Sequence, residues 1–141
     1  MSAAARRRQC PRTLVVDDLP DAAHTFAALL KSLGCETTAI TDPFVAVETV
    51  DRIQPEAVFL DLNMPGLGGL ELARMLRKKY GWQRLRIVAV TAFGSEEHRA
   101  ATRQAGFDAH VVKPVDPHLL ESMIHTLFPE MRWMTNPTPK S

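Results

Sequence analysis

The chain has 141 residues, of which 45% are hydrophobic and 23% charged; this is enough for one globular domain with a hydrophobic core and too little for two. Four arginines stand in the first twelve residues, which hold no acidic residue, whereas residues 13–141 hold 13 basic and 16 acidic side chains. This mildly acidic body argues against a dedicated nucleic-acid-binding module. No apolar run approaches the roughly 20 residues of a membrane span, and no apolar segment of a secretory signal follows the arginines.

Short apolar runs alternate with longer segments of helical periodicity. In chain order, the predicted elements are a strand at 13–16, a helix from Pro20 to Leu33, a strand at 37–40, a helix from Pro43 to about Ile53, a strand at 57–60, a helix at about 70–79, a strand at 87–90, a helix at 95–105, a strand at about 109–112 and a helix from Pro117 to Leu127. This alternation predicts an α/β fold, a doubly wound five-stranded parallel sheet with helices on both faces. The folded domain is expected at 12–128, between a basic, disordered leader (1–11) and a loose tail (129–141).

Cysteine is scarce in this chain. Cys10 and Cys35 are too few for a disulfide framework or a zinc site of four cysteines. The sequence therefore favours a protein of the reducing cytoplasm, with Cys35 as a small core residue at a helix-to-strand turn.

Polar residues follow four of the five predicted strands. Asp17 and Asp18 close the first strand, Asp61 the third, Thr91 the fourth and Lys113 the fifth. In an open doubly wound sheet, ligands bind outside the carboxyl ends of the strands, where the winding reverses. With strand order 2-1-3-4-5, that point lies between the first and third strands. We therefore expect three carboxylates to converge there, flanked by a hydroxyl and an ammonium.

Three carboxylates at one point repel one another unless a cation lies among them. An all-oxygen ligand set suits a hard divalent ion, and Mg²⁺ is the best candidate because it keeps several waters and often bridges to phosphate. Phosphoryl transfer depends mainly on positioning and charge stabilisation, so a carboxylate nucleophile, a metal ion, a lysine and a hydroxyl suffice for it.

At these residues the sequence resembles the receiver domain of two-component response regulators, over about residues 12–128. The matching motifs are Asp17-Asp18, then Asp61-Leu62-Asn63-Met64-Pro65 with Gly69 following, then Thr91-Ala92 and Lys113-Pro114, in the family's order and spacing. The resemblance implies a flavodoxin-like fold. The run from Gly106 to Asp116 is most similar to receivers attached to hybrid sensor kinases.

The resemblance also implies a role for each site residue. Asp61 would be the phosphoacceptor; Asp17, Asp18, Asp61 and the backbone carbonyl of Asn63 would hold Mg²⁺; Thr91 and Lys113 would contact the phosphoryl group. The Lys113–Pro114 bond is expected to be cis. A histidine kinase or histidine phosphotransferase would be the partner, and the output a conformational change or onward transfer. Only self-phosphorylation and self-dephosphorylation are expected as chemistry, in a monomer or weak phosphorylation-dependent dimer that contacts neither nucleic acid nor membrane directly.

One position departs from the family pattern. The family usually has Tyr or Phe three residues before the lysine, as the switch partner of the threonine, whereas this chain has His110. The inward movement of an aromatic ring is therefore in doubt here, and His110 is interpreted as a partly exposed side chain of the fifth strand. The helix at 95–105 offers little beyond Ala100, Ala101 and Ala105 to bury, so it is expected to dock weakly.

Two other functions remain open. A Mg²⁺-dependent aspartyl-phosphate phosphatase or transferase would need an acid two residues after the nucleophile, where this chain has Asn63. The second is an interaction module that is not phosphorylated, which nothing in the sequence recommends because all five site side chains are present.

The remaining features have simpler interpretations. The basic residues Arg74, Arg77, Lys78, Lys79, Arg84 and Arg86 are interpreted as a solvated surface around the end of one helix. Phe128, Met131, Trp133 and Met134 are predicted either to form a docking surface or to pack back on the domain.

Overall fold

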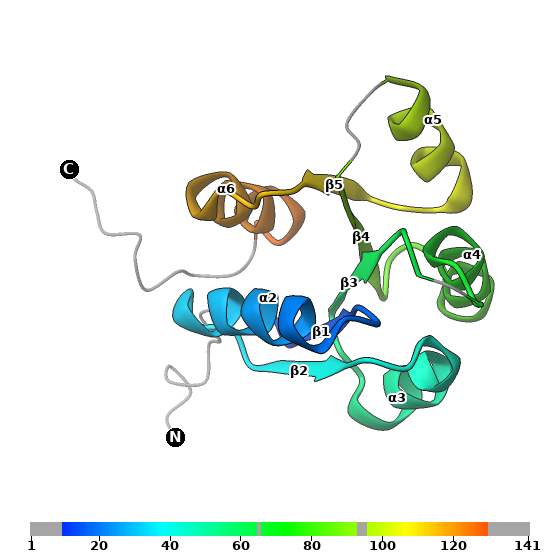
Figure 1. The fold of residues 1–141 in the computed structure, drawn as a ribbon, viewed down its shortest axis with the longest axis horizontal. Coiled ribbons are helices and arrows are strands. Elements are labelled where there is room, and N and C mark those ends of the chain that lie inside the picture. Colours follow the sequence, from blue (N-terminus) through cyan, green and yellow to red (C-terminus); the bar gives the residue numbers. More distant parts are fainter. Residues whose placement is uncertain (1–9, 65, 93–95, 130–141) are drawn as a thin grey trace.

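A central five-stranded parallel sheet lies between two layers of helices in the computed structural model, which describes residues 10–64, 66–92 and 96–129 (Figure 1). The elements are β1 (Thr13–Val16), α2 (Pro20–Ser32), β2 (Thr37–Ile40), the 3₁₀ turn η1 (Pro43–Val45), α3 (Ala46–Ile53), β3 (Ala57–Asp61), α4 (Gly69–Tyr80), β4 (Arg86–Thr91), α5 (Glu96–Ala105), β5 (Ala109–Val112) and α6 (Pro117–Leu127). The strand order is β2-β1-β3-β4-β5. The predicted fold class and strand order are confirmed.

The two faces of the sheet are buried by different helices (Figure 1). Val15 and Phe59 point into a core layer under α2 and α6, whereas Leu14, Val16 and Leu60 belong to the layer under α3, α4 and α5. Because both faces are covered, β1 and β3 are apolar at successive positions, as the sequence indicated. Within the described residues, no helix has the length and hydropathy needed to cross a bilayer.

α2 ends in a hydrogen-bonded turn that fixes the start of β2. Gly34 adopts a φ of +97°, its N–H donates to the carbonyl of Lys31 at 2.9 Å, and the N–H of Cys35 donates to the carbonyl of Leu30 at 3.1 Å. This pair of bonds is the Schellman motif, which favours glycine at the left-handed position. The turn therefore sets the backbone position of Cys35 without help from its side chain.

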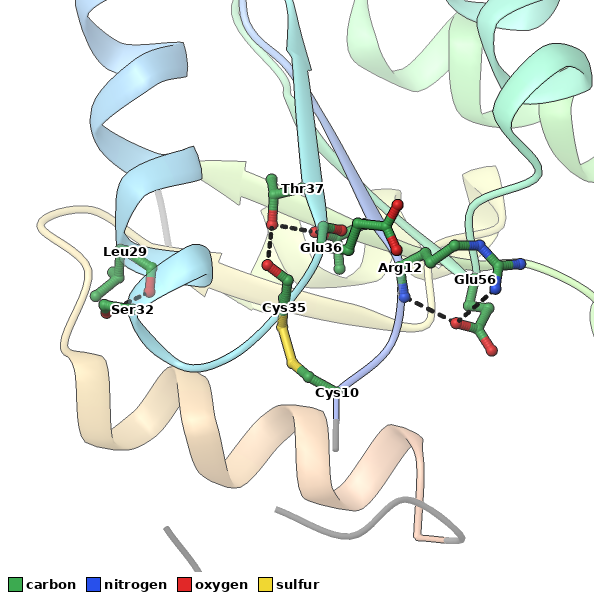
Figure 2. The surroundings of a disulfide bond; sticks show 9 residues. Cys10, Arg12, Leu29, Ser32, Cys35, Glu36, Thr37 and Glu56 are labelled. Atoms are coloured by element: carbon green, nitrogen blue, oxygen red, sulfur yellow. Dashed lines mark hydrogen bonds and ion pairs between the residues drawn. A yellow bond between two sulfur atoms is a disulfide. The ribbon is translucent and has the colours of Figure 1, made fainter. Parts of the chain in front are cut away.

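The sequence analysis did not anticipate that the two cysteines pair. Cys10 and Cys35 form a disulfide with a Cα–Cα distance of 4.8 Å, which joins the chain before β1 to the α2–β2 turn (Figure 2). Both residues are at most 5% exposed, and both belong to the core layer under α2 and α6. Cys35 is thus a buried residue at the helix-to-strand turn, as predicted, but it has a covalent partner.

Some local expectations were wrong. The helix predicted from Pro43 begins as a 3₁₀ turn, in which Asp42 accepts a hydrogen bond from the N–H of Phe44 at 2.9 Å. The helical periodicity of the last helix predicts Leu119 among its buried positions, but Leu119 is 69% exposed, because the buried stripe follows Leu120 and Ile124 and Leu119 lies to one side of it.

The carboxyl end of the chain is described only as far as residue 129. Phe128 is 5% exposed and packs into the core layer under α2 and α6, so it packs back on the domain. Met131, Trp133 and Met134 lie outside the described residues, as do residues 1–9 of the leader and 130–141 of the tail, so the domain limits 12–128 stay a prediction.

Arg77 contradicts the interpretation of the basic cluster as a solvated surface. It is 8% exposed, and its guanidinium pairs with the carboxylate of Asp108 at 2.7 Å. The same group donates to the carbonyls of Gly106, Gly81 and Leu85, and it lies 4.2 Å from the centre of the Trp82 ring. One buried side chain of α4 therefore connects the turns that flank β4 and α5.

We expect Arg77→Ala to lower the free energy of unfolding by about 3 kcal/mol, because it leaves the half-buried Asp108 carboxylate without its cation. Arg77→Lys should recover only part of this loss, since one ammonium cannot reproduce the planar fork of donors. Urea unfolding measures both variants. Arg74→Ala removes an exposed arginine of the same helix and should change the stability by less than about 0.5 kcal/mol. Equal losses in Arg77→Ala and Arg74→Ala would contradict the role of Arg77.

Candidate functional site

The carboxyl ends of β1 and β3 bring three carboxylates together. Val16 is aligned with Leu60 in the parallel register, so Asp17 and Asp61 stand side by side at one edge of the sheet. Both are 5% exposed, and Asp18 is half-buried. One carboxylate oxygen from each of the three lies within 4.8 Å of the others. The convergence predicted from the strand ends is therefore present.

The next two strands supply the hydroxyl and the ammonium. Thr91 is the last residue of β4 and is 1% exposed. The N–H of Lys113, just after β5, donates to the carbonyl of Thr91 at 2.8 Å. Lys113 Nζ lies 3.7 Å from Asp17 Oδ2 and 3.8 Å from Asp61 Oδ1. The Lys113–Pro114 peptide bond is cis, as predicted.

Backbone amides orient the two buried carboxylates. The N–H of Leu19 donates to Asp17 Oδ1 at 3.0 Å, and the N–H of Asn63 donates to Asp61 Oδ1 at 3.3 Å. In each case the donor is the amide two residues after the aspartate, so the turn that follows the strand fixes the orientation of the carboxylate. The metal-binding role of the Asn63 carbonyl stays a prediction.

Burial disfavours the charged form of Asp17. The loss of water raises its pKa above the usual value of 3.8, and the nearby carboxylate of Asp61 raises it further. The hydrogen bond from Leu19 and the ammonium of Lys113 act in the opposite direction without cancelling this effect. The site therefore carries an excess of negative charge that favours binding of a cation.

The donor set fits Mg²⁺. Three carboxylates offer only oxygen atoms, which a hard divalent ion prefers, and the cluster is open enough at Asp18 to leave room for water ligands. Among the ion pairs of the described residues, Lys113 is the one cation that reaches the two buried acids.

Gly69 lets α4 approach the loop that follows Asp61 closely. A Cβ atom at this position would lie 2.6 Å from the carbonyl oxygen of Asp61 and 2.9 Å from the Cα of Leu62. Both contacts are with backbone, which cannot move aside. Any other residue at 69 would therefore displace the segment that carries Asp61.

A cavity of about 420 Å³ opens beside the acidic cluster, and sequence reasoning missed it. Its walls are the inner side of α2, the middle of the sheet and the segment after Lys113; the lining includes Ala22, Phe26, Phe59 and Val115, with Asp17 and Asp61 at one end. These are ordinary core positions, so no sequence pattern could have marked the cavity.

His110 was expected to be partly exposed, and the helix before it, α5, to bury little beyond three alanines. His110 is half-buried, with Nδ1 3.5 Å from the hydroxyl of Thr102 in α5. Thr102 and Ala105 are buried, but Ala101 is exposed, which corrects the predicted set of buried alanines. Phe93, Gly94 and Ser95, in the loop before α5, lie outside the described residues.

Comparison with known proteins decides the family. The family profile of the response regulator receiver domain matches residues 13–125. The chain belongs to this family. A receiver domain of two-component signalling systems accounts both for the fold and for the acidic cluster at the carboxyl ends of β1 and β3.

Related receivers occur in several kinds of protein. The chain is 34% identical over 113 residues to the DNA-binding response regulator MtrA of Mycolicibacterium smegmatis, covering 80% of this chain and 48% of MtrA. It is 28% identical to the sensor protein GacS of Pseudomonas syringae pv. syringae, covering 94% of this chain and 15% of GacS. The chain thus spans half or less of these relatives.

A solved structure is similar at the level of the whole fold. The receiver domain of the sensor histidine kinase PA1611 from Pseudomonas aeruginosa PAO1 matches with a TM-score of 0.73 and 28% identity, covering 83% of this chain and 96% of that one. That structure has a magnesium ion coordinated in its active-site cleft.

We expect Asp17→Asn to raise the melting temperature of the metal-free protein at neutral pH, because the amide removes a charge that burial disfavours. The pKa of Asp17 is raised on folding, so the charged form costs stability above the usual pKa of 3.8 and the cost vanishes at lower pH, where both states are protonated. The gain should therefore grow as the pH rises from about 4, by about 1.4 kcal/mol for each pKa unit.

Thermal melts in the presence of a chelator, across this pH range, measure the effect. Asp21→Asn removes an exposed carboxylate four residues away and should show no such gain. The same pH dependence in both variants would contradict the assignment to Asp17.

Proposed function

We propose that this receiver accepts a phosphoryl group on Asp61 from the phosphohistidine of a histidine kinase or histidine phosphotransferase. The observation that supports it most directly is the position of Lys113, whose ammonium lies 3.8 Å from Asp61 Oδ1 and 3.7 Å from Asp17 Oδ2. A phosphoryl group on Asp61 would lie within reach of this cation, which compensates charge as the group is transferred.

The transfer needs little from the protein beyond position and charge. A carboxylate oxygen of Asp61 attacks phosphorus, the P–N bond of the phosphohistidine breaks, and the electron pair leaves with the imidazole. Lys113 stabilises the phosphoryl oxygens, and the hydroxyl of Thr91, on the neighbouring strand, is the second candidate donor to them. The N–H of Asn63 holds the attacking carboxylate in place at 3.3 Å.

Asp17, Asp18 and Asp61 are the residues that would hold Mg²⁺. When bound, the ion neutralises the carboxylates and the phosphoryl oxygens. Asp17 and Asp18 contribute the ligand atoms that do not react, and the half-buried position of Asp18 leaves it accessible from solvent. The raised pKa of Asp17 supports this assignment, because a cation restores its charged form.

The phosphatase alternative has less support in the structure. Position 63 holds an asparagine whose backbone N–H donates to Asp61, and its amide side chain is not an acid that can protonate a leaving group. The phosphoacceptor function requires no such acid.

Asp61→Asn should abolish phosphorylation by acetyl phosphate. Intact mass spectrometry measures the gain of about 80 Da that one phosphoryl group adds to a protein. Asp21→Asn, which removes an exposed carboxylate near the site, should be labelled like the wild type. Undiminished labelling of Asp61→Asn would place the phosphoacceptor elsewhere.

Mg²⁺ should raise the melting temperature of the wild-type protein by ligand linkage, with a shift of a few degrees at saturation. Asp18→Asn should require a higher Mg²⁺ concentration for the same shift, because one oxygen ligand loses its charge. The Asp21→Asn variant again serves as the control. Identical titration curves for the wild type and Asp18→Asn would show that the ion binds at another place.

A further inference from the structure

The disulfide lies at the opposite end of β1 from the acidic cluster. Cys10 stands three residues before β1, and Asp17 directly follows it, so one short strand separates the two sites. Figure 2 shows Cys10 reaching across to Cys35, at the edge of the sheet where the strands begin. The sulfur chemistry is therefore separate from the proposed phosphorylation chemistry.

The Cys35 side of the disulfide is held independently of the sulfur atoms. Its N–H donates to the carbonyl of Leu30 in the Schellman turn, and its carbonyl accepts a hydrogen bond from the hydroxyl of Thr37 at 3.3 Å. The same hydroxyl is 2.8 Å from that of Thr13, across the β1–β2 pair. Breaking the disulfide would therefore leave the Cys35 backbone in place.

On the other side of the disulfide, the first residue after Cys10 that is held by hydrogen bonds is Arg12. The N–H of Arg12 donates to Glu56 Oε1 at 2.8 Å, and its guanidinium donates to the carbonyl of Gln54 at 2.7 Å (Figure 2 shows the first of these bonds). The carbonyl of Arg12 accepts from the N–H of Glu56 at 2.8 Å. Loss of the disulfide would thus free the chain as far as Pro11 and leave the sheet intact.

The Cys35 thiol would also be tolerated in the reduced protein, in which Cys10 leaves the layer. Cys10 and Cys35 are 5% and 4% exposed, in an apolar layer that includes Leu30, Ile124 and Phe128. A protonated cysteine behaves as a small apolar side chain in such surroundings. Neither oxidation state leaves a buried charge, so the folded domain is compatible with both.

We propose that Cys10 and Cys35 form a reversible thiol–disulfide site that fixes the chain before β1 to the α2–β2 turn when oxidised and releases it when reduced. The oxidant is a small-molecule disulfide: the Cys10 thiolate attacks one of its sulfurs and expels one thiolate, and Cys35 then attacks the mixed disulfide and expels the second. Two protein thiols are oxidised and one disulfide is reduced to two thiols, so electrons and protons balance.

The first test is a titration of the folded wild-type protein with mixtures of reduced and oxidised glutathione, followed by alkylation with iodoacetamide in guanidinium chloride, where buried thiols are also accessible, and intact mass measurement. We expect a single reversible transition from no alkylated cysteine to two, reached from either direction. Two alkylated cysteines at every ratio would overturn the proposal, because the disulfide would not form. No alkylation even with excess dithiothreitol would overturn it too, because the bond would be permanent in the folded protein.

The second test compares melting temperatures of the oxidised and reduced protein. The disulfide closes a loop with a sequence separation of 25, so reduction should lower the melting temperature by about 10 °C through the entropy of the unfolded chain. The double variant Cys10→Ala/Cys35→Ala should have the same melting temperature in oxidising and in reducing buffer, because it has no thiol left to react. Equal melting of the oxidised and reduced wild type would contradict the proposed constraint.

Hydrogen exchange then locates the released segment. Amides of Arg12 and of β1 should exchange equally in the two oxidation states, because the contacts of Arg12 with Gln54 and Glu56 remain. Faster exchange throughout β1 on reduction would show that the sheet opens, contrary to the proposed release at Pro11. Acetyl phosphate labelling of Asp61 is measured independently, so failure of the redox proposal and failure of the phosphoacceptor proposal are distinguishable.

Discussion

The parallel pairing of β1 with β3 is the constraint on which the site depends. Val16 and Leu60 are fully buried neighbours in this pairing, and the chain places a carboxylate immediately after each of them. Two acids that would repel each other in a flexible chain are thus held side by side by the burial of apolar side chains on both faces of the sheet. The domain accepts an electrostatic cost at Asp17 because the surrounding core is large enough to offset it.

The same register arguments carry the remaining groups to the site. β4 pairs with β3 and ends at Thr91, and β5 pairs with β4 so that Lys113 leaves the sheet beside Thr91. The position of Lys113 therefore depends on the pairing of β4 with β3 and of β5 with β4, whereas the positions of Asp17 and Asp61 depend on the pairing of β1 with β3. Side chains from four segments far apart in the sequence meet because parallel strands present their carboxyl ends at one edge.

The fold and the acidic cluster were predictable from two things: the hydrophobic periodicity of short segments, and the rule that parallel strands present their carboxyl ends at one edge of the sheet. Apolar runs ending in Asp17, Asp61, Thr91 and Lys113 indicate buried strands, and alternation with helices makes these strands parallel. The buried state of Arg77 was not predictable, because it depends on the distant carbonyl of Gly106 and the carboxylate of Asp108. The cysteine pair and the cavity beside α2 likewise depend on how separate elements pack, which helical or strand periodicity does not encode.

Arg77 holds the carboxyl end of α5 but does not contact its amino end through any bond described above. Gly106, directly after the helix, is hydrogen-bonded to Arg77, whereas the amino end of the helix follows the loop after Thr91. The carboxyl end of α5 is therefore tied to α4 through Gly106, about 15 Å along the helix axis from the first residue of α5. Loss of the Arg77 side chain would therefore untie the carboxyl end of α5 from α4.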